Sequence, residues 1–153
     1  MLRRLFLPAL LAAKLATASD ELTSISQREN ALADAVRSKN KALLSTLTDK
    51  DFHVSWNQGT AIRSLETDVN RQAWIDDLNH LRIESYETEI SKVWRADKGE
   101  RNQPPWGVYV TLTEFWTVVS ARGRRIDKRV ESLDLWVRQQ GGWKLASRLS
   151  RSQ

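Results

Sequence analysis

The chain has 153 residues, a formal net charge of +5, seven tryptophans and no cysteine. This length fits one domain whose core is large enough to fold without disulfides, and the lack of cysteine excludes thiol catalysis and a cysteine metal site. The two histidines, His53 and His80, are well separated, so the usual ligands of a metal site are missing and we expect no metal and no cofactor.

The first residues have the order of a secretory signal peptide. Met1 to Arg4 is basic, Leu5 to Ala13 is apolar, and small residues up to Ala18 offer a cleavage site before Ser19. The apolar run is too short to cross a bilayer, so we expect no membrane span. We therefore predict a signal peptide at residues 1–18 and a mature domain at 19–153 that is secreted or periplasmic. An ordinary amphipathic first helix is the alternative.

Cleavage there would remove three basic residues and lower the formal net charge from +5 to +2. The basic balance of the whole chain is then weak support for nucleic-acid binding. The cationic residues from Arg122 to Arg129 fall at a predicted turn, where solvated charge is usual. We expect no nucleic-acid partner.

Helices are predicted in the first part of the mature chain. Apolar residues recur at helical spacing from Asp20 to Leu47, with a break at Lys39-Asn40 that divides the run into two helices. Asp51 to Trp56 alternates like a strand, and Asn57-Gln58-Gly59 is predicted to turn. Asn70 is placed to cap a short helix that turns three apolar side chains, Trp74, Ile75 and Leu78, toward the interior.

The rest of the chain is predicted to be β. Tyr86 to Trp94 alternates as a strand, a polar loop runs from Ala96 to Pro105, and Val108 to Ser120 is rich in β-branched and aromatic residues. Arg122-Gly123-Arg124 turns this strand back. Helices first and antiparallel strands afterwards indicate an α+β fold, with helices packed on one face of a curved sheet.

The segment from Ser132 to Ser150 is predicted to be a hairpin that turns at Gly141-Gly142. A four-residue loop places Trp136 across from Leu145 and Asp134 across from Ser147. One face then carries Asp134, Trp136 and Trp143, and the other carries Leu133, Leu135, Val137 and Ala146 beside Lys144 and Arg148. Neither face is purely polar, so we expect helices on one face and a second subunit on the other, as a homodimer. Packing within one chain is the alternative.

The mature chain resembles the nuclear transport factor 2-like superfamily, within its SnoaL-like and ketosteroid-isomerase-like group. The residues that carry the resemblance lie in five segments along the chain: Glu29 to Val36, Lys39 to Leu47, Asp49 to Phe52, Arg71 to Leu78, and Leu135 to Val137 with Gly142 to Ala146. The resemblance implies a cone-shaped α+β barrel with a cavity between helices and sheet, often in a dimer. The catalytic base, tyrosine and second acid of the isomerases have no counterpart that aligns here in Asp51, His53, Tyr86, Tyr109, Glu114 or Asp134.

Three functions fit these observations. The first is a binding domain for a small apolar or aromatic molecule, with Trp56, Tyr109 and Trp136 as the ligand-binding residues. The second is an isomerase, cyclase or dehydratase in which His53 or Asp134 transfers a proton. Asp134 also has a structural interpretation, as an acceptor bonded to Ser147 or to a nearby arginine. The third function is a structural dimerisation domain.

Overall fold

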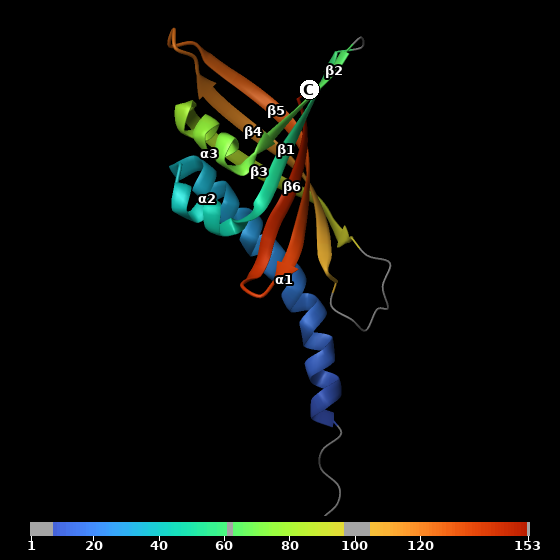
Figure 1. Ribbon diagram of the computed structural model, residues 1–153. Coiled ribbons are helices and arrows are strands. Elements are labelled where there is room, and N and C mark those ends of the chain that lie inside the picture. The colour runs from blue at the N-terminus through green and yellow to red at the C-terminus, as the bar shows by residue number, and fades with distance from the viewer. Residues whose placement is uncertain (1–7, 61–62, 97–104, 153) are drawn as a thin grey trace, which may run out of the picture.

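The computed structural model describes residues 8–60, 63–96 and 105–152, with the side chains of all of these except residues 8–20, 22 and 57–67. Three helices and six strands form a single layered unit (Figure 1). The helices are α1 (Pro8–Ser38), α2 (Lys41–Leu47) and α3 (Arg71–His80). The strands are β1 (Thr48–Thr60), β2 (Arg63–Asn70), β3 (Arg82–Arg95), β4 (Gly107–Val119), β5 (Arg125–Gln139) and β6 (Gly142–Ser152).

The break between α1 and α2 lies at the predicted residues. Lys39 has a positive φ of 52°, which ends α1, and Asn40 caps α2 by accepting a hydrogen bond from the Leu43 backbone at 3.0 Å. Asn70 caps α3 in the same way, through the Ala73 backbone N–H at 3.0 Å. Both predicted helix starts are therefore confirmed.

The six strands form one sheet in the order β2-β1-β6-β5-β4-β3. All neighbouring strands are antiparallel except β1 and β6, which run parallel. The turn predicted at Asn57-Gln58-Gly59 is wrong, because these residues continue β1 and pair with β2. Strand β2 was not predicted; pairing along β1 prevails over the local turn preference of these residues.

The β5–β6 hairpin is confirmed, but one predicted pair is not. Trp136 lies opposite Leu145 as expected, whereas Asp134 lies opposite Arg148 and not Ser147. The register shifts between these pairs because β6 has one extra residue, Ala146, in a β-bulge. Beyond the bulge, every β6 side chain points to the face opposite to the one that strict alternation predicts. Arg148, predicted on the leucine face, therefore shares the buried face with Asp134.

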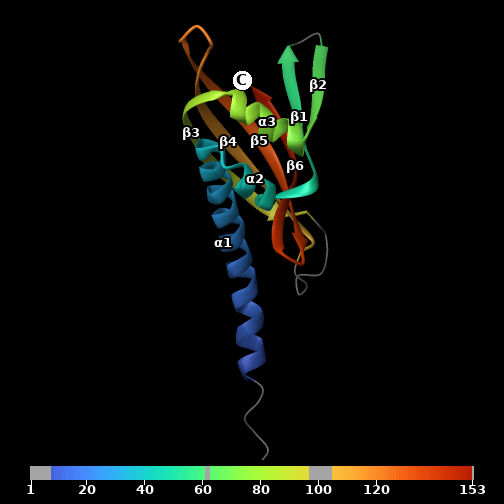
Figure 2. The ribbon, with the colours of Figure 1, turned by 60° about the vertical axis from the view of Figure 1, so that its left-hand side comes forward.

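The helices cover one face of the sheet, as Figure 2 shows for α1, α2 and α3. The core lies between the two layers, where buried side chains of α1 and α3 pack on alternate residues of the strands. This arrangement confirms the α+β prediction. We call the helix-covered face of the sheet the inner face, and the opposite one the outer face.

The predicted signal peptide stays a prediction, since residues 1–7 and the side chains of 8–20 lie outside the described part of the structure. Most of the predicted loop from Ala96 to Pro105 lies outside it too. None of the helices described has the length and apolar character needed to cross a membrane.

Candidate functional site

A cavity of about 180 Å³ lies between α3 and the inner face of the sheet. Its walls are largely apolar and include three tryptophans, one each from β1, α3 and β4: Trp56, Trp74 and Trp116. Aliphatic side chains complete the walls, and these are Leu78, Leu81, Val118 and Val130. The exposed residues Asp77, Lys128 and Ser152 lie at its mouth, and the buried residues Glu114 and Arg148 lie at its inner end.

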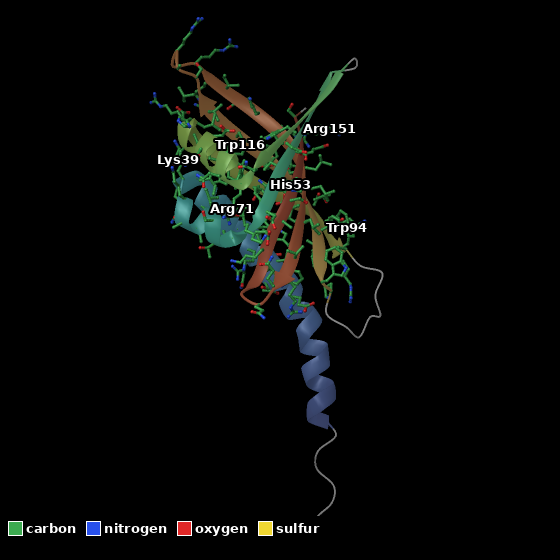
Figure 3. All side chains as sticks on the ribbon, in the orientation of Figure 1. Lys39, His53, Arg71, Trp94, Trp116 and Arg151 are labelled. Atoms are coloured by element: carbon green, nitrogen blue, oxygen red, sulfur yellow. The ribbon has the colours of Figure 1, made fainter. Side chains whose placement is uncertain are left out.

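Two of the tryptophans are held by neighbouring rings. The cap at Asn70 starts α3 so that Trp74 faces the sheet, where its ring meets Phe52 edge to face at 5.1 Å. Trp116 packs on Tyr86 with ring centroids 4.2 Å apart, and Figure 3 shows it beside α3. These aromatic contacts fix the cavity walls before any ligand binds.

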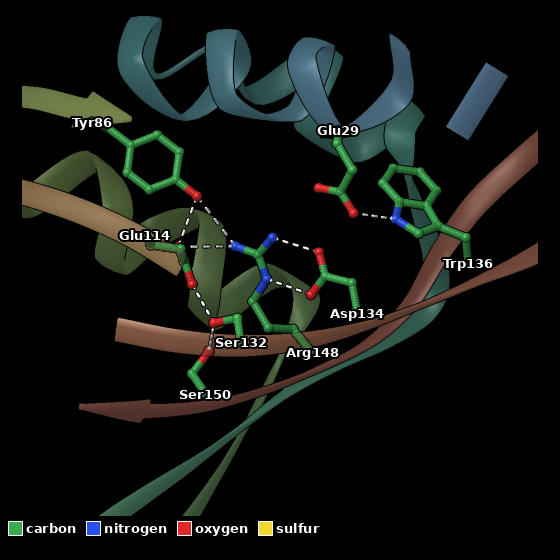
Figure 4. A network of polar contacts seen from close by, with 8 residues as sticks. All are labelled: Glu29, Tyr86, Glu114, Ser132, Asp134, Trp136, Arg148 and Ser150. Carbon is green, nitrogen blue, oxygen red and sulfur yellow. Dashed lines mark hydrogen bonds and ion pairs between the residues drawn. The ribbon is translucent and has the colours of Figure 1, made fainter. Parts of the chain in front are cut away.

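Behind the inner end of the cavity lies a buried polar network centred on Arg148 (Figure 4). Its guanidinium donates to both carboxylate oxygens of Asp134, from Nε at 2.7 Å and from Nη2 at 2.6 Å. Nη1 donates to Glu114 Oε2 at 3.2 Å. Arg148, Glu114 and Asp134 are at most 3% exposed. Such a paired arrangement is what allows charges to be buried in a core.

Three further side chains complete the network around Glu114. The Tyr86 hydroxyl donates to Glu114 Oε2 at 2.7 Å, and Ser132 donates to Oε1. The hydroxyls of Ser132 and Ser150 lie 2.8 Å apart. Burial, and then the Glu114 charge, raise the pKa of Tyr86 well above its usual value, so the phenol keeps its proton and remains a donor.

Helix α1 adds a second carboxyl beside Asp134. Glu29 is 2% exposed and accepts a hydrogen bond from Trp136 Nε1 at 2.6 Å. Burial raises the pKa of Glu29 well above its usual range, and the Asp134 charge raises it further. Burial also raises the pKa of Asp134, against the lowering effect of Arg148. Burial therefore favours a proton on Glu29, whereas the Arg148 guanidinium favours the charged form of Asp134.

The structure separates the five residues that were predicted to form the site. Trp56 lines the cavity. Asp134 and Trp136 share the inner face, as expected, but both are fully buried in the network and do not line the cavity. His53 and Tyr109 lie on the outer face. Each stands between two buried residues of its strand, and successive side chains of a strand point to opposite faces. His53 is exposed, and Tyr109 packs against Trp94 at 5.6 Å (Figure 3 labels His53 and Trp94).

Sequence reasoning gave no role to four residues of this network: Glu29, Tyr86, Glu114 and Arg148. The sequence pattern around two of them indicates a buried acid. Glu29 follows Ile25 by four residues on the apolar stripe of α1, and Glu114 alternates with Leu112 and Trp116 in the inward positions of β4. An acid in an apolar pattern indicates a buried carboxyl that needs a partner. Arg148 carried no such signal, because the bulge at Ala146 decides which way it points.

In the described ranges, no group of three or more histidine, aspartate or glutamate side chains is arranged to hold a metal ion. The arrangement instead offers a small apolar cavity that ends at a buried, hydrogen-bonded ion pair.

No protein-family model matches this sequence, and no curated protein matches it. Solved structures do match in three dimensions. A nuclear transport factor 2-like protein of unknown function in nutrient uptake from Rhodospirillum rubrum has a TM-score of 0.65 at 19% identity, over 84% of this chain and 98% of that one. A ketosteroid isomerase-like protein from Erwinia carotovora atroseptica has a TM-score of 0.66 at 14% identity, over 86% of this chain and 95% of that one.

A nuclear transport factor 2-like protein from Cytophaga hutchinsonii also gives 0.66 at 14% identity, over 87% of this chain and 98% of that one. The chain therefore has the nuclear transport factor 2-like fold that its sequence resembles. At these identities the likeness establishes the fold and not an activity, so function has to be argued from the cavity.

Proposed function

We propose that this protein is an exported domain that binds a small molecule of largely apolar surface in the cavity between α3 and the sheet. The observation that carries the proposal is the preformed cavity itself, lined by three tryptophans and four aliphatic side chains. Concave, mostly apolar sites with a few polar groups are typical of small-molecule binding.

The size of the cavity limits the ligand. Its volume of about 180 Å³ is close to that of a cavity of about 150 Å³ that holds one benzene ring. Drug-sized ligands occupy pockets of about 300 Å³ or more. A single ring or a short branched chain therefore fits, whereas the four fused rings of a steroid need a larger space.

Proton-transfer chemistry has less support. Neither predicted base lines the cavity: His53 lies on the outer face, and Asp134 is bound by Arg148 behind the cavity. Glu114 does line it, but its oxygens already accept hydrogen bonds from Tyr86, Ser132 and Arg148. A carboxylate with this many fixed donors serves better to hold the wall in place than to move a proton.

Export and dimer formation complete the proposal. Export is supported by the basic, apolar and small-residue order of the first 18 residues. Dimer formation through the outer face is supported by two large apolar side chains there, Phe115 and Leu149, which are 40% and 48% exposed.

Titration with small ring compounds tests the binding function. Calorimetry of the purified domain with phenol, indole and cyclohexanol should show saturable binding of at least one of them. Val118→Phe fills the cavity and should weaken that binding about tenfold or more. Val137→Phe is the matched control, because Val137 is also half-buried in a strand but does not line the cavity. Equal binding by both variants, or no saturable binding of any small compound, charged or neutral, would refute the proposal.

A further inference from the structure

The cavity walls are rich in aromatic carbon. Trp56, Trp74 and Trp116 come from three different elements and all line the same space. Trp116 Nε1 is buried and has no hydrogen-bond partner among the described residues, so the part of its ring that reaches the cavity is carbon. Tryptophan rings attract cations more strongly than other aromatic rings, because their faces carry negative electrostatic potential.

The inner end of the cavity is also electrically unbalanced. Among the described residues, the buried charged side chains are three carboxyls, Glu29, Glu114 and Asp134, and one guanidinium, Arg148. The cluster therefore has a net negative charge even when Glu29 holds a proton. At the mouth, Asp77 and Lys128 carry opposite formal charges and add no net charge. A positive charge in the cavity would neutralise the buried excess.

The polar atoms of Glu114 and Arg148 at this end already have hydrogen-bond partners. The two Glu114 oxygens accept from three donors, and Arg148 donates through all three of its nitrogens. A primary ammonium group, with three N–H donors, would lose its water and find few free acceptors. A quaternary ammonium group has no N–H to satisfy and spreads its charge over methyl groups.

We propose that the ligand of this cavity is a small quaternary ammonium compound, held by Trp56, Trp74 and Trp116 and attracted by the charge of Glu114. This inference rests on the proposed binding function and specifies its ligand class. The trimethylammonium head is similar in breadth to a single ring, so it fits the volume that limits the ligand.

Comparison of a cation with its neutral carbon analogue tests the inference. Calorimetry at pH 7 would compare choline and tetramethylammonium with the alcohol in which a tert-butyl group replaces the trimethylammonium group of choline. The two molecules have the same shape, so their difference reports the charge. We expect choline to bind about tenfold or more tightly than the alcohol.

Equal or tighter binding of the neutral alcohol would overturn the inference and leave the binding function intact. If neither choline nor the neutral alcohol binds while a ring compound does, the inference is likewise overturned and the binding function stands. Failure of every compound would overturn the binding function as well.

A pair of tryptophan variants tests whether the preference for choline over the neutral alcohol arises in the cavity. Trp56→Leu should reduce choline affinity about fivefold or more and the affinity for the neutral alcohol much less. Trp94→Leu is the matched control, because Trp94 is also half-buried but lies on β3 outside the cavity. Equal losses for choline and the alcohol in Trp56→Leu would show that the ring supplies only apolar contact and would overturn the inference. The comparison on the unmodified protein decides the question even where a variant fails to fold.

Discussion

The buried pair Glu29 and Asp134 should respond unequally when each carboxyl is replaced by its amide. Glu29→Gln keeps an oxygen for Trp136 Nε1 and places no charge beside Asp134, so it imitates the protonated acid. We expect it to change the free energy of unfolding at pH 7 by less than about 1 kcal/mol. Asp134→Asn removes the negative charge that faces Arg148 and should cost much more.

The contacts of Asp134 set the size of that loss. Its two oxygens accept charge-assisted hydrogen bonds at 2.7 and 2.6 Å, and an asparagine would turn an N–H₂ donor toward one of the same guanidinium donors. Breaking a buried ion pair from one side costs about 3 to 5 kcal/mol. Because Arg148 keeps Glu114 at 3.2 Å, we expect a value near the lower end of this range, about 3 kcal/mol.

Urea denaturation at pH 7, followed by circular dichroism, measures both variants. Glu131→Gln is the control, since Glu131 lies on the same strand in an exposed ion pair with Arg151 at 2.7 Å. Glu131→Gln should lower the free energy of unfolding by less than about 1 kcal/mol. If Glu29→Gln destabilises as much as Asp134→Asn, Glu29 carries a charge in the folded protein, and our placement of a proton on Glu29 is wrong.

Four other predictions follow from the same structure. The pKa of Glu29 is raised in the folded state, which therefore holds a proton that the unfolded chain releases above about pH 4.3. The free energy of unfolding should thus fall as pH rises from there toward the folded pKa, with a smaller slope in Glu29→Gln; equal slopes in urea titrations would contradict this. Trp136→Phe removes the donor to Glu29 and should cost about 1 to 3 kcal/mol by chemical denaturation, and no measurable loss would contradict a stabilising bond. Sedimentation at micromolar concentration should show a dimer that Leu149→Glu converts to a monomer, whereas a monomeric unmodified domain would exclude the outer face as an interface. Intact-mass analysis of exported protein should give a chain that begins at Ser19, and retained Met1 would refute the signal peptide.

Local sequence determined most of the secondary structure. The helix break at Lys39-Asn40, the caps at Asn40 and Asn70 and the glycine turn of the last hairpin depend on residues within a few positions of each other. Capping and positive φ are local preferences, so they can be predicted from such short segments. The α+β class followed from the order of these elements along the chain.

Tertiary structure alone decided the composition of the site. The extra residue Ala146 in β6 inverts the alternation and turns Arg148 inward, and no local pattern announces a bulge of this kind. Glu29 reaches Asp134 only because α1 packs on the sheet 105 positions away in sequence. His53 and Tyr109 point outward because the helices cover one face, and strand alternation by itself does not say which face that is. Outside the bulged strand β6, the sequence thus specified which side chains share a face of a strand, and the packing of helices on the sheet decided which of those faces became the cavity.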